Sequence, residues 1–221
     1  MTSPHVPDSA FPQWAFSDRR AVSDPFEPLD EAEAARAGRL KRSEDAQDFL
    51  HARWLARSLA AQTLPGAGDI RIESFDDARP QITGWPEAAI SWSRSGPLGV
   101  AAIQAGGLIG IDIERKAARQ TGPMLEMVAQ PQEAECVLSP GAETERLERF
   151  YRLWTAKEAV LKARGKGLRG GAKKVEIPED FISGERDAAT LVETFGAFRL
   201  VRLDVGAEAC CSLVFSVRTG I

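Results

Sequence analysis

The chain has 221 residues, of which 43% are hydrophobic and 27% are charged, so it is long enough to bury a sizeable core. A formal net charge of −4 argues against a protein that binds polyanions over its whole surface. The longest apolar run, residues 98–111, contains Gln104 and is shorter than the ~18 residues of a membrane-spanning helix. We therefore expect no membrane partner, no secretory signal, and a cytoplasmic protein whose three cysteines are reduced thiols.

The order of helical and strand-like segments predicts an α+β fold with mostly antiparallel strands. Residues 1–30 hold five of the thirteen prolines and are predicted to form an extended leader. Helices are expected over much of 30–61, at 122–137 and at 143–164, and strands at 70–75, 89–93, 198–205 and 210–217. The apolar segments 98–103 and 108–114 are predicted to pair as a hairpin across Ala105-Gly106-Gly107.

Two acidic side chains follow each other at strand spacing in Ile109-Gly-Ile-Asp112-Ile-Glu114. Alternate strand residues point to the same face, so Asp112 and Glu114 share one face, about 6.6 Å apart at Cα. Both carboxylates could then reach one ion. The alternative is a half-exposed strand with a solvated polar face.

The segment 143–164 places Leu147, Tyr151, Trp154, Glu158 and Leu161 on one stripe of a helix. Glu158 is the acidic member of this otherwise apolar stripe, and a buried carboxylate is costly unless it is paired or binds a metal. Lys162, one turn later, is a possible structural partner. We nevertheless expect Glu158 to be functional.

Positive charge is concentrated in residues 146–174, which hold ten basic side chains and two acidic ones. A solvated helix face explains part of this excess, but the Gly-Lys-Gly segment 165–167 suggests an anionic partner. The Gly-x4-Gly-Lys-Ser/Thr spacing of a P-loop is absent. Three carboxylates beside basic residues suit Mg²⁺ bridging to a phosphate ligand, with Mn²⁺ as an alternative, and hence phosphoryl transfer.

The motifs Gly110-Ile-Asp112-Ile-Glu114 and Trp154-Thr-Ala-Lys157-Glu158-Ala-Val-Leu-Lys162, followed by Gly165-Lys-Gly-Leu168, resemble the signature of the 4′-phosphopantetheinyl transferases. The similarity is to the larger, surfactin-synthetase-activating type and covers about residues 30–178. It implies transfer of the phosphopantetheine arm of coenzyme A, the co-substrate, to a serine of an acyl or peptidyl carrier protein. Adenosine 3′,5′-bisphosphate would be released.

The resemblance also implies roles for the catalytic residues. Asp112, Glu114 and Glu158 would hold the magnesium ion, while Lys162, with Lys157 as a further candidate, would neutralise phosphate charge. Glu133 falls near the base for the carrier serine, and Glu135 takes that place if the alignment shifts. Asp112 or a metal-bound water could equally accept the serine proton.

Coenzyme A contacts are implied at Arg36, Arg79, Ser93 and Arg94. Arg94 replaces a histidine that is usual in the family, and it can still bind phosphate. Arg79 replaces the lysine of a Gly-Lys-Pro loop. Phe49 stands where a hydroxyl or basic residue is common, which puts one phosphate contact in question.

The implied fold has two similar α+β halves related by a pseudo-twofold axis, with the active site in the cleft between them. The boundaries are a leader 1–30, an N-terminal half 31–104 and a C-terminal half 105–221 that carries the metal site. A monomer is expected. Two competing hypotheses are a non-catalytic module that binds coenzyme A or a carrier protein, and a nucleic-acid binder that uses the basic segment. No nucleic-acid motif supports the second, and we expect no nucleic-acid partner.

Overall fold

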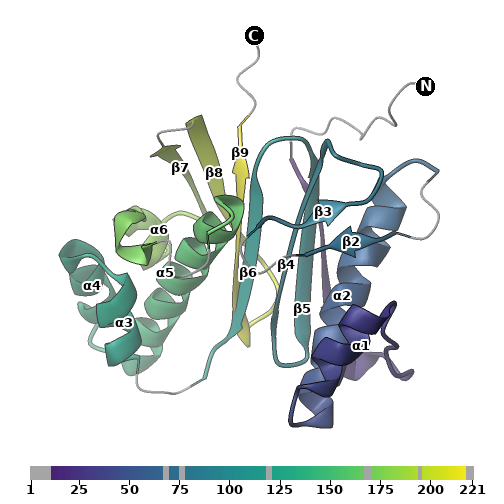
Figure 1. Ribbon diagram of the computed structural model, residues 1–221. Coiled ribbons are helices and arrows are strands. Elements are labelled where there is room, and N and C mark those ends of the chain that lie inside the picture. The colour runs from purple at the N-terminus through teal and green to yellow at the C-terminus, as the bar shows by residue number, and fades with distance from the viewer. Residues whose placement is uncertain are drawn as a thin grey trace. The chain divides into compact units, whose positions relative to one another are not determined.

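The computed structural model describes residues 11–66, 70–74, 78–117, 121–166, 171–193 and 196–217 (Figure 1). The chain divides into two compact units, Met1–Ser74 with Pro80–Gly106, and Phe75–Arg79 with Gly107–Ile221. The predicted division at residues 104/105 differs from this one by two residues and by the segment Phe75–Arg79, which joins the second unit. Within the described residues, no helix combines the length and hydropathy needed to cross a membrane.

In the first unit a long helix packs on an antiparallel sheet. The strand order is β1 (Gln13–Asp18), β5 (Leu98–Ala105) and β4 (Ala88–Ser95). Helix α2 (Ser43–Thr63) covers β5 and β4, and α1 (Glu31–Gly38) packs on α2. The short strands β2 (Ile72–Glu73) and β3 (Gln81–Ile82) pair beside them, and η1 (Arg19–Ala21) follows β1. Small residues such as Ala56 and Ala101 are fully buried where helix and sheet meet.

Two sequence-based expectations for this unit are wrong. Residues 13–18 of the predicted leader have the expected extended backbone, but they form β1 and pair with residues 98–103 of β5. The predicted hairpin between 98–103 and 108–114 does not form, because β5 has β1 and β4 as neighbours while residues 109–115 belong to another sheet. Apolar character marks both strands correctly, but it does not identify the partner of either.

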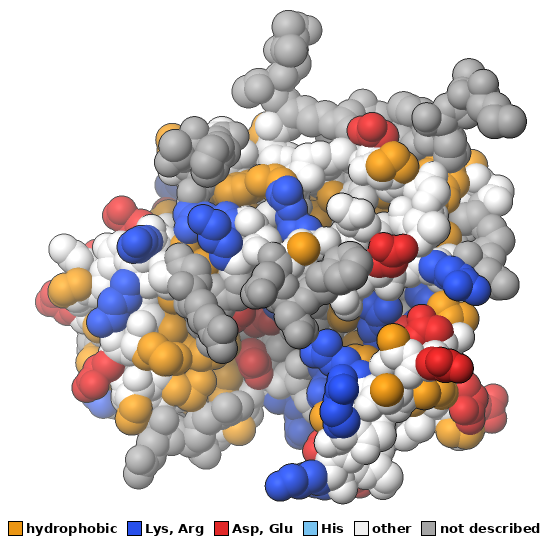
Figure 2. All heavy atoms as spheres, viewed as in Figure 1, with side chains coloured by type: hydrophobic (Ala, Val, Ile, Leu, Met, Phe, Trp, Pro, Cys, Tyr) orange, Lys and Arg blue, Asp and Glu red, His pale blue; other side chains and the backbone are white. Residues whose placement is uncertain are grey.

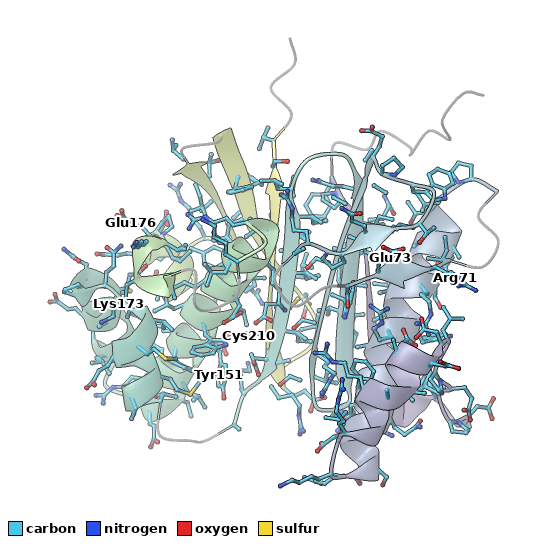
Figure 3. The ribbon with its side chains drawn as sticks, in the orientation of Figure 1. Arg71, Glu73, Tyr151, Lys173, Glu176 and Cys210 are labelled. Atoms are coloured by element: carbon cyan, nitrogen blue, oxygen red, sulfur yellow. The ribbon has the colours of Figure 1, made fainter. Side chains whose placement is uncertain are left out.

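The second unit carries its sheet in the order β6 (Ile109–Arg115), β9 (Ala209–Ser216), β8 (Gly196–Leu203) and β7 (Ala188–Glu193). Helix α5 (Glu143–Ala163) lies on β6 and β9, and α3 (Gly122–Val128), α4 (Pro131–Leu138) and α6 (Glu179–Ser183) pack around it (Figure 1). The short helix η3 is Ala172–Lys174. Tyr151 of α5 and Cys210 of β9 belong to the core between helix and sheet (Figure 3).

The helix predicted at 122–137 is two helices, because the chain is extended at Ala129 and Pro131 starts a new helix. Proline fits the first helical turn, where its missing N–H has no partner to lose. Cys210 and Cys211 are buried free thiols, and burial raises the pKa of Cys210 to about 12. Neither is a reactive thiolate at neutral pH.

Both units follow the same strand order around a long helix. In each, the strand before the helix pairs antiparallel with the last strand, and the last strand pairs antiparallel with the one preceding it. The helices α2 and α5 both have 21 residues. The predicted α+β class with antiparallel sheets is confirmed, whereas the structural similarity of the two halves stays a prediction. The pseudo-twofold axis stays a prediction.

Candidate active site

A close approach between β6 and α5 determines which face of the strand carries chemistry. A Cβ at Gly110 would collide with the Ala159 carbonyl oxygen of α5 and lie 2.6 Å from the Ala163 nitrogen. Gly110 therefore faces the helix, and alternation places Asp112 and Glu114 on the same face. The face with Asp112 and Glu114 is thus covered by a helix, so the interpretation as a simple solvated strand face does not hold.

The helix α5 brings Glu158 and Lys162 to this face. Two alanines of α5, Ala159 and Ala163, pack on Gly110. Glu158 directly precedes the first of them and Lys162 the second. The Lys162 ammonium donates to Asp112 Oδ1 at 2.7 Å and to the Ile111 carbonyl at 3.1 Å. Lys162 therefore pairs with Asp112 rather than with Glu158, its predicted structural partner.

Burial and neighbouring charge perturb Glu158 strongly. Burial, followed by the negative charge of Asp112, raises the pKa of Glu158 to about 7, with a smaller contribution from Glu114 and an opposing one from Lys162. Its Oε1 atom is buried and accepts no hydrogen bond from the described residues. A carboxylate with a buried oxygen of this kind is stabilised by a cation or by a proton.

The donor set fits a hard divalent cation. Mg²⁺ prefers carboxylate oxygens, and it is commonly bound by one or two carboxylates together with substrate phosphates rather than by a complete protein cage. The unsatisfied Glu158 oxygen beside Asp112 matches that pattern. Among the described residues, however, no three acidic, histidine or cysteine side chains form a ready-made metal cluster. Lys162 already donates to Asp112, the most buried of the three carboxylates.

The side chains of Glu133 and Lys157 lie together in the interior of the second unit. Their side chains are 3% and 1% exposed, and Lys157 Nζ lies 2.5 Å from Glu133 Oε2. Lys157 also donates to the carbonyls of Ala172 and Val175. All three ammonium protons therefore have acceptors, which leaves none for a phosphate.

Arg79 lies beside the glycine motif that follows α5. A Cβ at Gly165, whose φ is +68°, would fall 2.9 Å from Arg79 Cγ. The predicted boundaries put Arg79 in the first half, but it is part of the second unit. Gly167 and Leu168, the rest of that motif, lie outside the described residues.

The other predicted coenzyme A contacts lie in the first unit. Arg36 is exposed on α1 and stands over the Phe49 ring, 5.7 Å from its centroid. Basic and acidic side chains both lie around α1 (Figure 2). Ser93 and Arg94 are neighbours on β4, where they pair with Val100 and Gly99 of β5, so they point to opposite faces of the sheet.

Sequence reasoning missed a buried ionic cluster in the first unit. Glu33 is paired with Arg53 at 2.7 Å and with Arg57 at 2.5 Å, and the Arg53 guanidinium stands 4.8 Å over the centroid of the Trp92 ring. The spacing of the two arginines, four residues apart on a helix, is a usable signal that they share a face. Nothing in the sequence marks Glu33 as their partner.

A cavity of about 600 Å³ lies between α4, α5 and α6. Among the predicted site residues, Glu135, the alternative to Glu133 as the base, lines this cavity. The full lining is Gln132, Glu135, Cys136, Ser139, Arg149, Glu179, Asp180, Ser183 and Glu185. This cavity is therefore separate from the carboxylates of β6 and α5.

Comparison with known proteins points to one family. Residues 108–205 match the model of the 4′-phosphopantetheinyl transferase superfamily. A Synechocystis protein whose name assigns it to the 4′-phosphopantetheinyl transferases is 33% identical over 70% of the chain and 64% of its own length. The 4′-phosphopantetheinyl transferase ffp of Bacillus subtilis is 30% identical, over 64% of the chain and 67% of its own length.

A mammalian protein is also similar. The L-aminoadipate-semialdehyde dehydrogenase-phosphopantetheinyl transferase of Rattus norvegicus is 27% identical over 75% of the chain and 59% of its own length. The chain thus spans about three fifths to two thirds of the length of these relatives. The matched superfamily region lies within the second unit and contains both β6 and α5.

Proposed function

Because the chain belongs to the 4′-phosphopantetheinyl transferase superfamily, we propose that it transfers the 4′-phosphopantetheine group of coenzyme A to a serine of an apo acyl or peptidyl carrier protein. In this reaction the serine oxygen forms a bond to the phosphorus that bears the pantetheine arm. The bond between that phosphorus and the bridging oxygen of the pyrophosphate breaks. The serine proton passes to a base, and adenosine 3′,5′-bisphosphate leaves.

One observation supports this proposal above the others. Glu158 is electrostatically coupled to Asp112, Glu114 and Lys162, with the lysine in contact with Asp112. Such a group, acidic and basic side by side, suits a ligand that consists of a cation and a phosphate. The coupling is within the second unit and so does not depend on how the two units are arranged.

Asp112, Glu114 and Glu158 would hold the magnesium ion. When bound, Mg²⁺ would neutralise charge on the pyrophosphate and on the leaving group. Lys162 would be drawn from Asp112 towards phosphate oxygens as negative charge accumulates on them. Its side chain is 30% exposed, so it can change partner without being pulled from a closed core.

The coenzyme A contacts proposed here are those that the resemblance implies. Arg79, beside Gly165, is close to the end of α5 that carries Lys162 and would contact the pyrophosphate. Arg36 would contact the 3′-phosphate, and Arg94 and Ser93 would contribute further polar contacts. The cleft between halves, the monomeric state and the cytoplasmic location stay predictions.

The proton of the carrier serine requires an acceptor. Asp112, or a water held by the carboxylates, is favoured over Glu133, because Glu133 is buried and already accepts several hydrogen bonds.

Intact-mass spectrometry tests the reaction directly. An apo acyl carrier protein and an apo peptidyl carrier protein are incubated with this chain, coenzyme A and Mg²⁺. We expect each carrier that is a substrate to gain the mass of one phosphopantetheine, and EDTA to abolish the gain. Coenzyme A binding without any mass gain on several carriers would indicate the non-catalytic module instead. Transfer that persists in EDTA would contradict the metal assignment alone.

A further inference from the structure

Glu133 and Lys157 form the centre of a buried hydrogen-bond network in the second unit. Glu133 Oε1 accepts the Ile177 N–H at 2.9 Å, and Oε2 accepts the Gln130 N–H at 2.7 Å as well as the lysine ammonium. Lys157 donates to the Ala172 carbonyl at 3.1 Å and the Val175 carbonyl at 2.7 Å. The pair thereby connects the start of α4, the middle of α5 and the segment 172–177.

This arrangement is unsuited to a general base. A base must lie within hydrogen-bonding reach of the proton that it removes, either directly or through one water. Both oxygens of Glu133 are engaged with groups of the same unit, and the residue is 2% exposed. Its capping-box contact with the Gln130 N–H also makes it part of the α4 terminus.

The position of Lys157 in the chain links the network to the active site. It directly precedes Glu158, and Ala159 follows at the contact with Gly110. Successive helix residues are 100° apart, so fixing Lys157 on one side of α5 determines the direction of Glu158. Lys173, in the segment tied to the pair, lies near α3 and α4 (Figure 3), and its carbonyl accepts a hydrogen bond from the Gln130 side-chain amide.

We propose that Glu133 and Lys157 are positioning residues: the buried pair sets the rotation of α5 and so directs Glu158 towards Asp112 on β6. This inference rests on the proposed transferase function for its kinetic consequence. Its structural part, that the pair fixes α5 and segment 172–177, stands independently of that function.

Single and double substitutions of the buried pair distinguish a positioning role from the role of a general base. Removing one partner leaves an uncompensated charge in the interior, whereas replacing both by uncharged groups of similar volume is often tolerated. A positioning pair can therefore be rescued by a second substitution. A general base cannot, because the double variant still lacks the carboxylate.

The experiment compares Glu133→Gln, Lys157→Met and the double variant with the wild-type chain in the coenzyme A and apo carrier assay. We expect each single variant to lose about tenfold or more in kcat, and the double variant to return to within about fivefold of wild type. Hydrogen exchange at segment 171–177 and in α5 should accelerate in the single variants and recover in the double one. Glu176→Gln and Lys174→Met, exposed neighbours, serve as matched controls and should behave as wild type.

Two results would overturn the inference. The first is a Glu133→Gln loss of about 10²–10⁴-fold that Lys157→Met neither shares nor rescues, because that pattern belongs to a base. The second is wild-type hydrogen exchange and wild-type turnover in both single variants and in the double variant. If a single variant does not fold, the double variant still decides between the two roles. A folded and active double variant supports a positioning pair, and a folded but inactive one indicates a base. If the wild-type chain forms no product in the assay, only the proposed function is refuted. The hydrogen-exchange data then test whether the pair fixes α5 and segment 172–177.

Discussion

Gly110 on β6 and Ala163 on α5 approach so closely that a Cβ on the glycine would lie 2.6 Å from the alanine nitrogen. Real Cβ atoms do not make such contacts, so the helix backbone can rest on the strand only because residue 110 has no side chain. The same contact brings Asp112, two residues along the strand, to the helix face of Glu158 and Lys162. Packing and the candidate chemistry therefore depend on one small residue.

We predict that Gly110→Ala destabilises the chain and disturbs the site together. The added methyl group must push α5 away from β6, and overpacking of this kind costs about 1–3 kcal/mol. Thermal unfolding should show a lowered Tm. The rate of transfer should fall because Lys162 moves away from Asp112. Gly141→Ala is the control, since a Cβ there meets nothing within 4 Å. Equal Tm values for the two variants would show that the close approach is not obligatory.

Neutralising the central carboxylates should abolish transfer while the fold persists. Asp112→Asn and Glu158→Gln keep nearly the same volume, so the change is one of charge. We expect a loss of at least about 100-fold in kcat/KM, by analogy with the removal of other transition-state charge stabilisers. Asp187→Asn, an exposed carboxylate of the same unit paired with Arg202, is the control and should retain activity. Wild-type turnover in both site variants would remove them from the mechanism.

The raised pKa of Glu158 predicts an unusual pH dependence of stability without metal. The folded chain holds the Glu158 proton up to about pH 7, whereas an unfolded glutamate releases it near pH 4.5. Between these values the folded state binds more protons, so the free energy of unfolding falls as the pH rises. The contribution is of the order of 1–3 kcal/mol.

Denaturant melts of the metal-free chain at pH 5, 6 and 7 measure this dependence. Glu158→Gln should show a flatter profile and be more stable than wild type at pH 7 in EDTA. Added Mg²⁺ should narrow that difference, because a cation favours the ionised carboxylate. A wild-type profile that rises in parallel with the variant over this range would contradict the assigned environment of Glu158.

The sequence predicts the local character of the site better than its connections. Strand alternation places Asp112 and Glu114 on one face, and helical spacing places Glu158 on a largely buried stripe, because both patterns depend on the backbone period alone. The partner of Lys162 cannot be predicted in this way. Asp112 is fifty residues away in the chain, and only the sheet-on-helix packing brings the two together.

The incorrect predictions also concern contacts between residues that are distant in the sequence. Apolar composition indicates strands at 98–103 and 108–114, but strand pairing is a long-range choice that composition does not encode, so the predicted hairpin is wrong. Glu133 and Lys157 have the residue types of a base and a phosphate ligand. Their mutual burial follows from α4 packing on α5, which no single-sequence pattern reveals.

The buried cluster of Glu33 supplies a prediction for the first unit. Glu33 is the single buried residue of α1, a helix that the structure describes completely, and its carboxylate pairs with Arg53 and Arg57 of α2. Burial raises the pKa of Glu33, but hydrogen bonds from the Leu29 N–H and Arg53, together with the Arg57 charge, outweigh it and leave the pKa below its usual value. The pair interactions therefore stabilise the fold above the unfolded pKa, and this contribution is lost as the pH falls through the folded value.

Glu33→Ala should cost about 3 kcal/mol at pH 7, because the buried Arg53 and the largely buried Arg57 lose their carboxylate. The loss relative to wild type should shrink in acid, as the pH falls below the usual pKa of a glutamate towards the lowered pKa of folded Glu33. Urea melts at pH 7 and pH 3 measure both effects, and Glu31→Ala, an exposed carboxylate of the same helix, is the control. Since α1 also carries Arg36, Glu33→Ala should raise the KM for coenzyme A if Arg36 binds phosphate. Lowered stability with an unchanged KM would support a purely structural role for the Glu33 cluster. It would also remove Arg36 from the proposed binding site.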